Sequence, residues 1–258
     1  MKRVFIEDEA VSETLGYILI FGIVLTCIAF ILLVGNSMLD TAKSQNNFKS
    51  MEQGLTVLSS DMKQVALEGT PVKTTRIHME GGSIANYNAS NELIVKFNGV
   101  TEYDNYTGNI TFQSSTDPSI ISIENGGLWE MTNINSSDIV VLKPRIYYIP
   151  QTKTLIMNVI RLGGNMSAIG GSATVDINLQ YSTTNVYSYS VPAGSMTITF
   201  NTAYPRAWSR FLIDDNVLAP AGATTLTALD NNSFTVNVNQ PQVSNLIISE
   251  HWINASIG

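Results

Sequence analysis

The sequence predicts an α+β protein in which a long hydrophobic N-terminal helix precedes a mostly antiparallel, sandwich-like β domain. Two observations support this prediction. Residues 15–35 form an apolar stretch without a charged residue, and the chain after residue 70 is a series of short segments that alternate in polarity or are rich in β-branched residues. A chain of 258 residues is long enough for both parts and for a core within the β domain.

The apolar stretch LGYILIFGIVLTCIAFILLVG (15–35) has the length of a membrane span. A helix of this length covers about 31 Å, which matches the hydrocarbon thickness of a bilayer. The apolar core of a secretory signal peptide has roughly 7 to 15 residues and precedes an A-x-A-like cleavage site. This stretch is longer and ends in Gly35-Asn36-Ser37-Met38. We therefore predict a helix that stays on the protein, as a membrane span or as the core of a filament.

The helical pattern continues beyond the apolar stretch as an amphipathic segment over residues 38–68. Its apolar residues recur at spacings of three and four: Phe48, Met51, Leu55, Leu58, Met62 and Val65. Gly69 suits a helix cap and Pro71 cannot continue a helix, so the whole N-terminal helix is expected over residues 11–69. The apolar stripe either packs against the β domain or forms a coiled-coil seam, and its short length favours packing.

After Pro71 the pattern changes to that of strands, interrupted by turn residues such as NGV, DPS, NGG, LGGN, PAG and QPQ. Residues 70–258 are therefore predicted to form one β-rich head domain. The expected strands are 72–79, 92–98, 109–113, 119–124, 138–149, 154–162, 172–182, 185–191, 195–201, 232–239 and 243–253. One exception is YPRAWSRFLIDD (204–215), in which a Pro is followed by apolar residues at helical spacing, and this segment predicts a short helix.

The composition restricts the class of protein. Only 14% of the residues are charged, whereas about 25% is typical. The chain has 24 Asn and 49 Ser plus Thr residues, so amides and hydroxyls supply much of its surface. The net charge is −7 and no basic run is present, which argues against nucleic-acid binding. The single cysteine, Cys27, lies in the apolar stretch and excludes an intrachain disulfide.

Charge and sequons indicate a single-pass protein of the cell membrane. Lys2 and Arg3 precede the span, and basic residues beside a span usually stay on the cytoplasmic side. This positive-inside rule favours a cytoplasmic N-terminus and an extracellular C-terminal domain. Acidic residues contribute little to the rule. Seven sequons for N-glycosylation follow the span, at Asn88, Asn105, Asn109, Asn135, Asn165, Asn231 and Asn254. About 4 or 5 would occur by chance at this composition, so they support the external location only weakly.

Signatures of catalysis and of metal binding are missing from the sequence. The two histidines, His78 and His251, are too few for a His-based metal site, and no nucleophile elbow, Walker loop or dinucleotide fingerprint occurs. Asp214-Asp215 lacks the further oxygen ligands of a calcium loop and predicts a turn. We therefore expect a protein that is not an enzyme and has no cofactor or metal.

AVSETLG at residues 10–16, directly before the long apolar helix, resembles the start of the archaeal type IV pilin-like proteins. Their class III signal is short and often shows an A/G-V-S-x-x-x-G pattern before the hydrophobic helix, and AVSETLG occupies residues 10–16 here. The chain is most similar to an uncharacterised archaeal membrane-protein family of pilin-like architecture in which V-S-E-T-L-G-Y precedes the helix. GTPVKTTRIHMEGG (69–82) and A-W-x-R-F (207–211) are similar to later landmarks of that family.

The resemblance implies processing by a prepilin peptidase between Ala10 and Val11, which would make residues 1–10 a cytoplasmic leader. Two features depart from the pattern. Ile6-Glu7-Asp8-Glu9 precede the cut where basic residues are usual, and Glu13 would be the third mature residue instead of the fifth. Either the freed α-amino group of Val11, in the same or a neighbouring subunit, pairs with Glu13, or Glu13 lies in the interfacial layer at the positive end of the helix dipole.

Two hypotheses of function follow. The first is a pilin-like surface subunit, whose partners are membrane lipid, other pilin-like subunits through the N-terminal helix, and the peptidase. The second is a permanently anchored β-sandwich module that binds a surface glycan or an envelope protein. A set of aromatic residues could form its carbohydrate face, although at strand spacing such residues are more often core: Tyr103, Tyr106, Trp129, Tyr147, Tyr148, Tyr187 and Tyr189.

Overall fold

The computed structural model describes residues 8–116, 118–132, 138–214, 217–218, 224–239 and 242–258, and of residues 8–14 and Asn239 the backbone alone. The chain divides into two compact units, Met1–Asn46 and Asn47–Gly258. The fold class is the predicted one, a long apolar N-terminal helix followed by a mostly antiparallel β-rich domain.

Helix α1 (Asp8–Leu67) begins three residues before the predicted helix and ends two residues before its predicted end. It ends where Gly69 takes a left-handed conformation with φ +75°. The N–H groups of Glu68 and Thr70 both donate to the carbonyl oxygen of Gln64, at 3.1 and 3.3 Å. These bonds satisfy a carbonyl group that the last helical turn leaves free, so the sequence signal at Gly69 acts as predicted.

The remaining elements are one short helix and fourteen described strands. The helix is α2 (Pro205–Ile213), with its Pro in the first turn as predicted. The strands are β1 (Val72–Tyr87), β2 (Glu92–Phe97), β3 (Val100–Tyr106), β4 (Asn109–Gln113), β5 (Ile120–Glu124), β6 (Gly127–Met131), β7 (Ile139–Leu142), β8 (Ile146–Ile149), β9 (Thr154–Gly163), β10 (Ser167–Ser190), β11 (Ser195–Asn201), β12 (Thr224–Leu229), β13 (Ser233–Asn239) and β14 (Asn245–Ile257).

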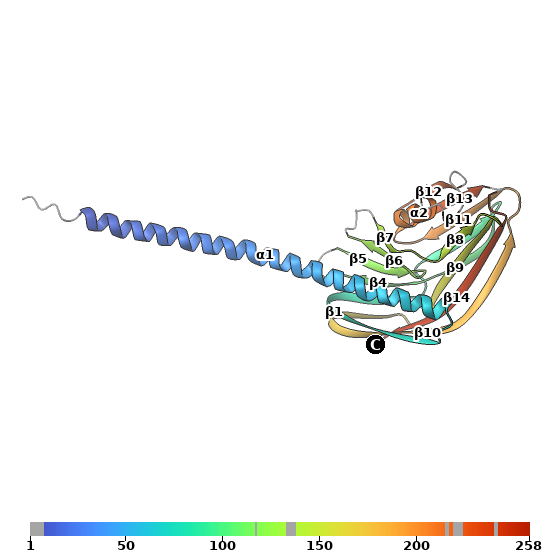
Figure 1. Ribbon diagram of the computed structural model, residues 1–258, viewed down its shortest axis with the longest axis horizontal. Helices are drawn as coiled ribbons and strands as arrows, with labels where there is room; N and C mark the ends of the chain where they lie inside the picture. Colours follow the sequence, from blue (N-terminus) through green and yellow to red (C-terminus); the bar gives the residue numbers. More distant parts are fainter. Residues whose placement is uncertain (1–7, 117, 133–137, 215–216, 219–223, 240–241) are drawn as a thin grey trace, which may run out of the picture. The chain divides into compact units, whose positions relative to one another are not determined.

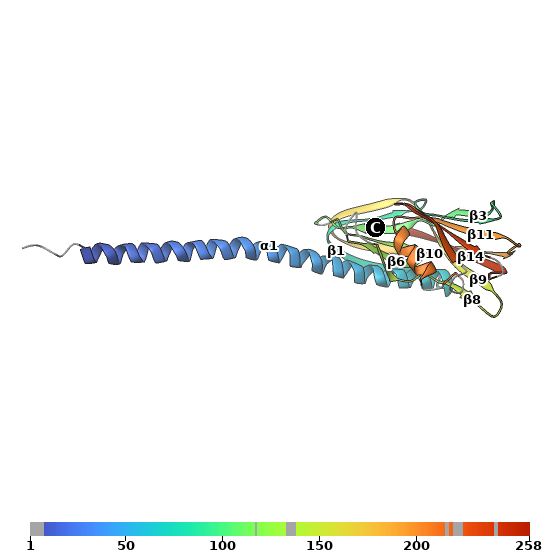
Figure 2. The same cartoon turned by 90° about the horizontal axis from the view of Figure 1, so that it is seen from above.

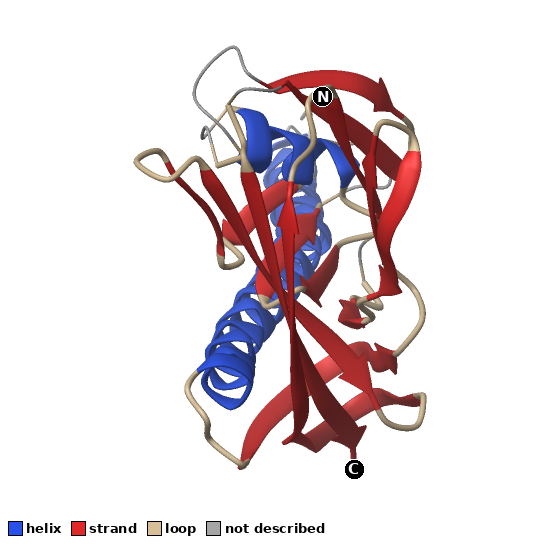
Figure 3. Cartoon of the chain, turned by 90° about the vertical axis from the view of Figure 1, so that its right-hand side faces the viewer, coloured by secondary structure: helices blue, strands red, loops and turns tan. Residues whose placement is uncertain are grey.

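Within the described residues the strands form two sheets (Figure 1). The larger has the order β7-β6-β5-β4-β1-β10-β14-β9-β8, and the smaller has the order β12-β13-β11-β2-β3. All pairs of described strands are antiparallel except β14 and β9, which run parallel from Asn245 beside Thr154 to Asn254 beside Gly163. Figure 3 shows the long strands of the larger sheet crossing one another in projection, as expected from the right-handed twist of β-strands.

Several strands differ from their predicted bounds. Strand β1 continues past residue 79. At Gly81 and Gly82 its pairing with β10 shifts in register, and the pairing then resumes beyond them. The predicted strand 138–149 is two strands, since Pro144 lies between β7 and β8. The predicted strands 172–182 and 185–191 are parts of one strand, β10, with a shift between Tyr181 and Thr183. Strands β3, β6 and β12 were not predicted.

The first hydrophobic core lies between the smaller sheet, helix α2 and strands β6, β8, β9 and β14 of the larger sheet. Its centre is aromatic. The rings of Trp129 and Trp208 stack with centroids 4.2 Å apart, and Phe200 stacks on Trp208 at 4.7 Å and on Phe234 at 5.1 Å. These side chains are almost fully buried, and they fix α2 between the two sheets.

The second core lies between the C-terminal part of α1 and the larger sheet (Figures 1 and 2). Met51, Leu55, Leu58, Met62 and Val65 of the predicted stripe are each no more than 1% exposed, and Phe48 packs at the edge. Their partners come mainly from β1, β4, β5 and β10. The prediction that the stripe packs against the β domain is thus confirmed.

Strand β5 separates these two groups of side chains. Ile121 and Ile123 point toward α1 in the second core, whereas Ser122 and Glu124 bond residues at the start of α2. This division follows from the alternation of side chains along a strand. At β5 the larger sheet is therefore covered on one face by α1 and on the other by α2. The polar side chains of Ser122 and Glu124 are thereby held inside the domain.

Candidate functional site

In the N-terminal unit, the described part of α1 exposes large apolar side chains. From Leu15 to Leu39 these are 42–75% exposed, and α1 is the described helix that is long and apolar enough to cross a membrane. The predicted processing residues Ala10 and Val11 and the predicted assembly residue Glu13 lie in the first turns of α1. Their side chains lie outside the described residues, so their roles remain predictions.

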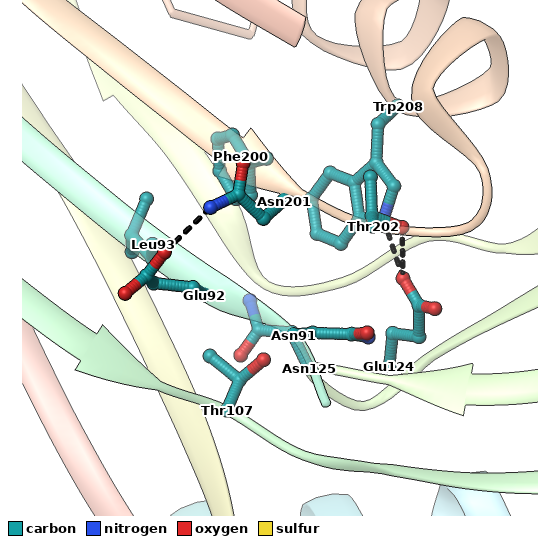
Figure 4. A pocket seen from close by; sticks show the side chains of 10 residues that line it. All are labelled: Asn91, Glu92, Leu93, Thr107, Glu124, Asn125, Phe200, Asn201, Thr202 and Trp208. Carbon is teal, nitrogen blue, oxygen red and sulfur yellow. Dashed lines mark hydrogen bonds between the residues drawn. The ribbon is translucent and has the colours of Figure 1, made fainter. Parts of the chain in front are cut away.

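In the head, the most unusual polar group is Glu124 at the end of β5. It is 1% exposed, and its Oε2 atom accepts hydrogen bonds from Thr202 Oγ1 at 2.6 Å and from Trp208 Nε1 at 3.0 Å (Figure 4). The described part of the chain offers no cation to this carboxylate, and its Oε1 atom is buried without a hydrogen bond. Glu124 is therefore a buried acid that neutral donors hold in place.

Burial raises the pKa of Glu124 above its ordinary value of 4.5. The bonds from Thr202 and Trp208 and the nearby amides of Asn91 and Asn109 offset part of this rise. Beside the carboxylate lies a small cavity of about 10 Å³, bounded by Asn91, Thr107 and Phe200 among others. Such a volume accommodates about one water-sized molecule, which is too little for an organic substrate.

A larger, open groove adjoins this cavity and shares Asn91, Asn201 and Thr202 with it. Its volume is about 550 Å³, within the usual range of ligand sites. The described residues that line it are uncharged, and they include Tyr87, Ser90, Asn109, Asn232 and Ser233. We call this the Thr202 groove.

A second buried carboxylate, Glu250 of β14, contrasts with Glu124 because it is paired. Oε1 accepts hydrogen bonds from Arg161 at 2.9 Å, Tyr103 at 2.8 Å and Asn105 at 3.1 Å, and Oε2 accepts one from Trp252 at 3.1 Å. The Arg161 guanidinium also lies 3.9 Å from the centre of the Trp252 ring. Burial raises the pKa of Glu250, but these donors outweigh burial and hold the pKa below 4.5.

Both histidines contact hydroxyl side chains. His251 lies between Thr184 and Ser249, with ring nitrogens 2.9 Å from each hydroxyl oxygen. Burial lowers the pKa of His251. His78 lies on the exposed side of β1, 3.1 Å from Thr174. Across the described residues, no three His, Cys, Asp or Glu side chains are placed to hold a metal ion.

The sequon asparagines differ in accessibility. Asn165, Asn231 and Asn254 are exposed. The Nδ2 atoms of Asn88 and Asn105 donate to Gly164 O at 3.0 Å and to Glu250 Oε1 at 3.1 Å. Asn109 is only 7% exposed, and Asn135 lies outside the described residues. A glycan on Asn109 would have to displace buried contacts, so this sequon is the least accessible of those described.

The proposed aromatic face is not one surface. Trp129 is fully buried and Tyr103 is 4% exposed, while Tyr187 and Tyr189 pack against the first core. Only Tyr106 and Tyr147 of that set are strongly exposed, at 48% and 46%. Sequence reasoning missed Tyr87, Glu124 and Glu250. For Glu124 a signal exists, since a carboxylate ends the apolar run SIISIE just before the turn NGG.

Comparison with known proteins gives a family but no function. A family model described as "Family of unknown function (DUF7289)" matches residues 9–255. An uncharacterised protein of Archaeoglobus fulgidus is 32% identical over 95 residues, which cover 37% of this chain and 31% of that protein. The match thus spans about a third of the relative's length. No solved structure matches the chain.

Proposed function

We propose that this chain, which belongs to the DUF7289 family of unknown function, is a pilin-like cell-surface protein that is held by its N-terminal helix and exposes its β-rich head. The observation that carries the proposal is the contrast along α1. The large apolar side chains from Leu15 to Leu39 are exposed, whereas those of the stripe are buried in the head: Met51, Leu55, Leu58, Met62 and Val65. An exposed apolar surface of this extent needs lipid or other apolar helices to cover it.

The proposed mechanism is hydrophobic assembly. The apolar helices of several copies leave the bilayer and pack against one another, exchanging lipid contacts for helix contacts. Small residues support close approach, since a Cβ atom added at Gly16, Gly22 or Gly35 would meet nothing within 4 Å beyond the adjacent residues and the backbone of its own helical turns. Space at these positions is therefore available to a neighbouring helix.

Processing before Val11 would prepare the chain for this assembly. We propose that a prepilin peptidase removes residues 1–10 and leaves the apolar stretch on the mature protein. Glu13 then lies near a new α-amino group, and pairing of these charges would lower the cost of a carboxylate beside the apolar stretch. In this proposal the N-terminus is cytoplasmic, the head is extracellular, and the chain has no catalytic role.

The alternative is a permanent anchor, in which the same helix stays in lipid and the head binds a glycan or an envelope protein. The Thr202 groove supports a binding role of this kind, and it is compatible with either form of anchoring.

Shearing of intact cells distinguishes assembly from permanent anchoring. We expect the chain in a sheared, high-mass surface fraction, detected with an antibody to the head. Ala10→Leu enlarges the residue before the cut and should retain the leader and keep the chain in the membrane fraction. Val4→Leu, within the leader but away from the cut, is the matched control and should assemble normally. If the native chain and both variants occur only in the membrane, the filament proposal is wrong.

A further inference from the structure

We propose that the Thr202 groove binds neutral carbohydrate. This inference goes beyond the proposed function, because it requires the head to lie outside the cell but does not require the helices to assemble. It rests on the lining of the groove, on one exposed tyrosine, and on the positions of three sequons.

The lining of the groove fits an uncharged, hydroxyl-rich ligand. The described side chains around its volume of about 550 Å³ are amides, hydroxyls, one alanine and one tyrosine, without a charged group. An anionic or cationic ligand would find no opposite charge here. A sugar hydroxyl both donates and accepts hydrogen bonds, which matches amide and hydroxyl side chains.

Two buried amides lie at the base of the groove. Asn91 and Asn109 line the groove and are 6% and 7% exposed. The Nδ2 atom of Asn91 and the Oδ1 atom of Asn109 make no hydrogen bond of normal geometry. Both amides also lie near the Glu124 carboxylate and lower its pKa, so they make the base of the groove polar.

Tyr87, at the end of β1, supplies an apolar surface in this polar setting. Its side chain is 39% exposed although it lines the groove. An aromatic ring beside hydrogen-bonding groups suits a sugar, which presents C–H groups on the face of its ring and hydroxyls around the edge. We expect Tyr87 to contact the ring face of the bound sugar.

Three sequons converge on the same groove, because Ser90, Asn109 and Ser233 belong to the sequons of Asn88, Asn109 and Asn231. The amide of Asn88 is bonded to Gly164, and Asn109 is buried, but Asn231 is exposed. Asn231 lies in the turn between β12 and β13, and the N–H of Thr202 donates to the carbonyl of Asn232 at 2.9 Å. The turn is thereby fixed at the groove.

The carbohydrate can thus come from two sources. One is a glycan attached to Asn231 of the same chain, and the other is a glycan from a neighbouring molecule. The two sources share the chemistry that the groove recognises, so the experiment has one arm for each.

The first arm uses the full chain purified from native membranes. Peptide mass analysis should find a glycan on Asn231, and hydrogen exchange at residues 87–91 and 231–233 should be slower than in Asn231→Gln. Asn254→Gln removes an exposed sequon that does not line the groove and is the control. It should leave exchange at these residues unchanged.

The second arm titrates full-length Asn231→Gln in detergent with maltotriose, chitotriose and mannotriose. We expect one of them to bind, and Tyr87→Ala to weaken binding by about tenfold. Tyr147→Ala removes a similarly exposed tyrosine of β8 and should leave the affinity unchanged. Protection in the first arm or Tyr87-dependent binding in the second supports the proposal.

The inference is overturned if neither arm gives its expected signal, including the case of a glycan on Asn231 that leaves exchange in the groove unaltered. Its failure is distinguishable from failure of the proposed function. Shearing experiments report on the helix, whereas these measurements report on the head.

Discussion

Trp208 Nε1 donates a hydrogen bond of 3.0 Å to Glu124 Oε2 and so joins helix α2 to strand β5 inside the head. The same indole ring stacks between Trp129 and Phe200. One side chain therefore connects a buried acid with the aromatic centre of the first core. Because Glu124 has no cationic partner among the described residues, ionisation of its carboxyl group should lower the free energy of unfolding.

We predict that Glu124→Gln flattens the dependence of stability on pH. The raised pKa of Glu124 means that the folded state binds more protons than the unfolded state above pH 4.5. The free energy of unfolding should therefore fall as the pH rises from 4.5 toward the folded-state pKa, and the variant should lack this loss. Denaturant unfolding of the full chain in detergent, at a series of pH values, measures the difference.

The glutamine keeps an oxygen that can accept from Thr202 and Trp208, so the variant should be at least as stable as the native chain at neutral pH. A variant that loses stability at neutral pH while its pH dependence stays native would show that the ionised carboxylate is favourable at this position.

We predict that Arg161→Ala, unlike Glu124→Gln, lowers the free energy of unfolding, because the Glu250 carboxylate depends on the Arg161 cation. Removal of one partner of a buried ion pair typically costs about 3 kcal/mol or more, and Arg161 and Glu250 have side chains only 15% and 2% exposed. The lowered pKa of Glu250 contributes stability above pH 4.5 that is lost as the pH falls through the folded-state pKa. The difference between native and variant chains should thus shrink in acid.

Arg206→Ala is the matched control, since it removes one positive charge from an exposed position of α2. We expect its unfolding free energy to stay within about 0.5 kcal/mol of the native value. Equal effects of the two variants would mean that net charge, and not the Glu250 contact, determines the loss.

The apolar stripe of α1 gives a third test, which compares two adjacent residues. Leu58 is fully buried in the second core, whereas Val57 is 54% exposed. Leu58→Ala should lower the unfolding free energy of the head by about 2–5 kcal/mol, as expected for a large buried side chain, and Val57→Ala should change it by less than about 0.5 kcal/mol. Similar small effects at both positions would contradict the packing of α1 on the sheet.

The irregularity in β1 gives a fourth test. Gly82 has φ +104°, and a Cβ atom there would lie 2.4 Å from the carbonyl oxygen of Gln113. Gly82→Ala should cost about 1–3 kcal/mol, because the backbone conformation and the neighbouring strand both oppose it. Gly170→Ala is the control, since its Cβ would make only ordinary contacts, the nearest at 3.6 Å. Thermal unfolding of both variants compares them.

The parts of the fold that depend on local pattern could be predicted from the sequence. The spacing of Met51, Leu55 and Leu58 and the cap at Gly69 determined the helix, and period-two alternation located most strands. Strands β3, β6 and β12 were missed because VTEYDNY, GLWEM and TTLTAL carry charges, a leading glycine or several threonines in place of clear alternation. Their strand conformation depends on pairing with neighbours.

The candidate sites could not be predicted in the same way, since they join residues far apart in the chain. Thr202 reaches Glu124 across 78 positions, and Tyr103 reaches Glu250 across 147. No local spacing encodes such contacts. The aromatic set failed for the same reason, because only the packing of sheets and helices decides that Trp129 is buried while Tyr87 is exposed.

The central claim is that a peptidase removes only residues 1–10, so that the apolar N-terminal helix stays on the mature pilin-like protein. N-terminal sequencing of the protein from native membranes tests this claim most directly. We predict a mature chain that begins at Val11. A native protein that still begins at Met1, or one that begins beyond Asn36 and so lacks the apolar stretch, would contradict the account.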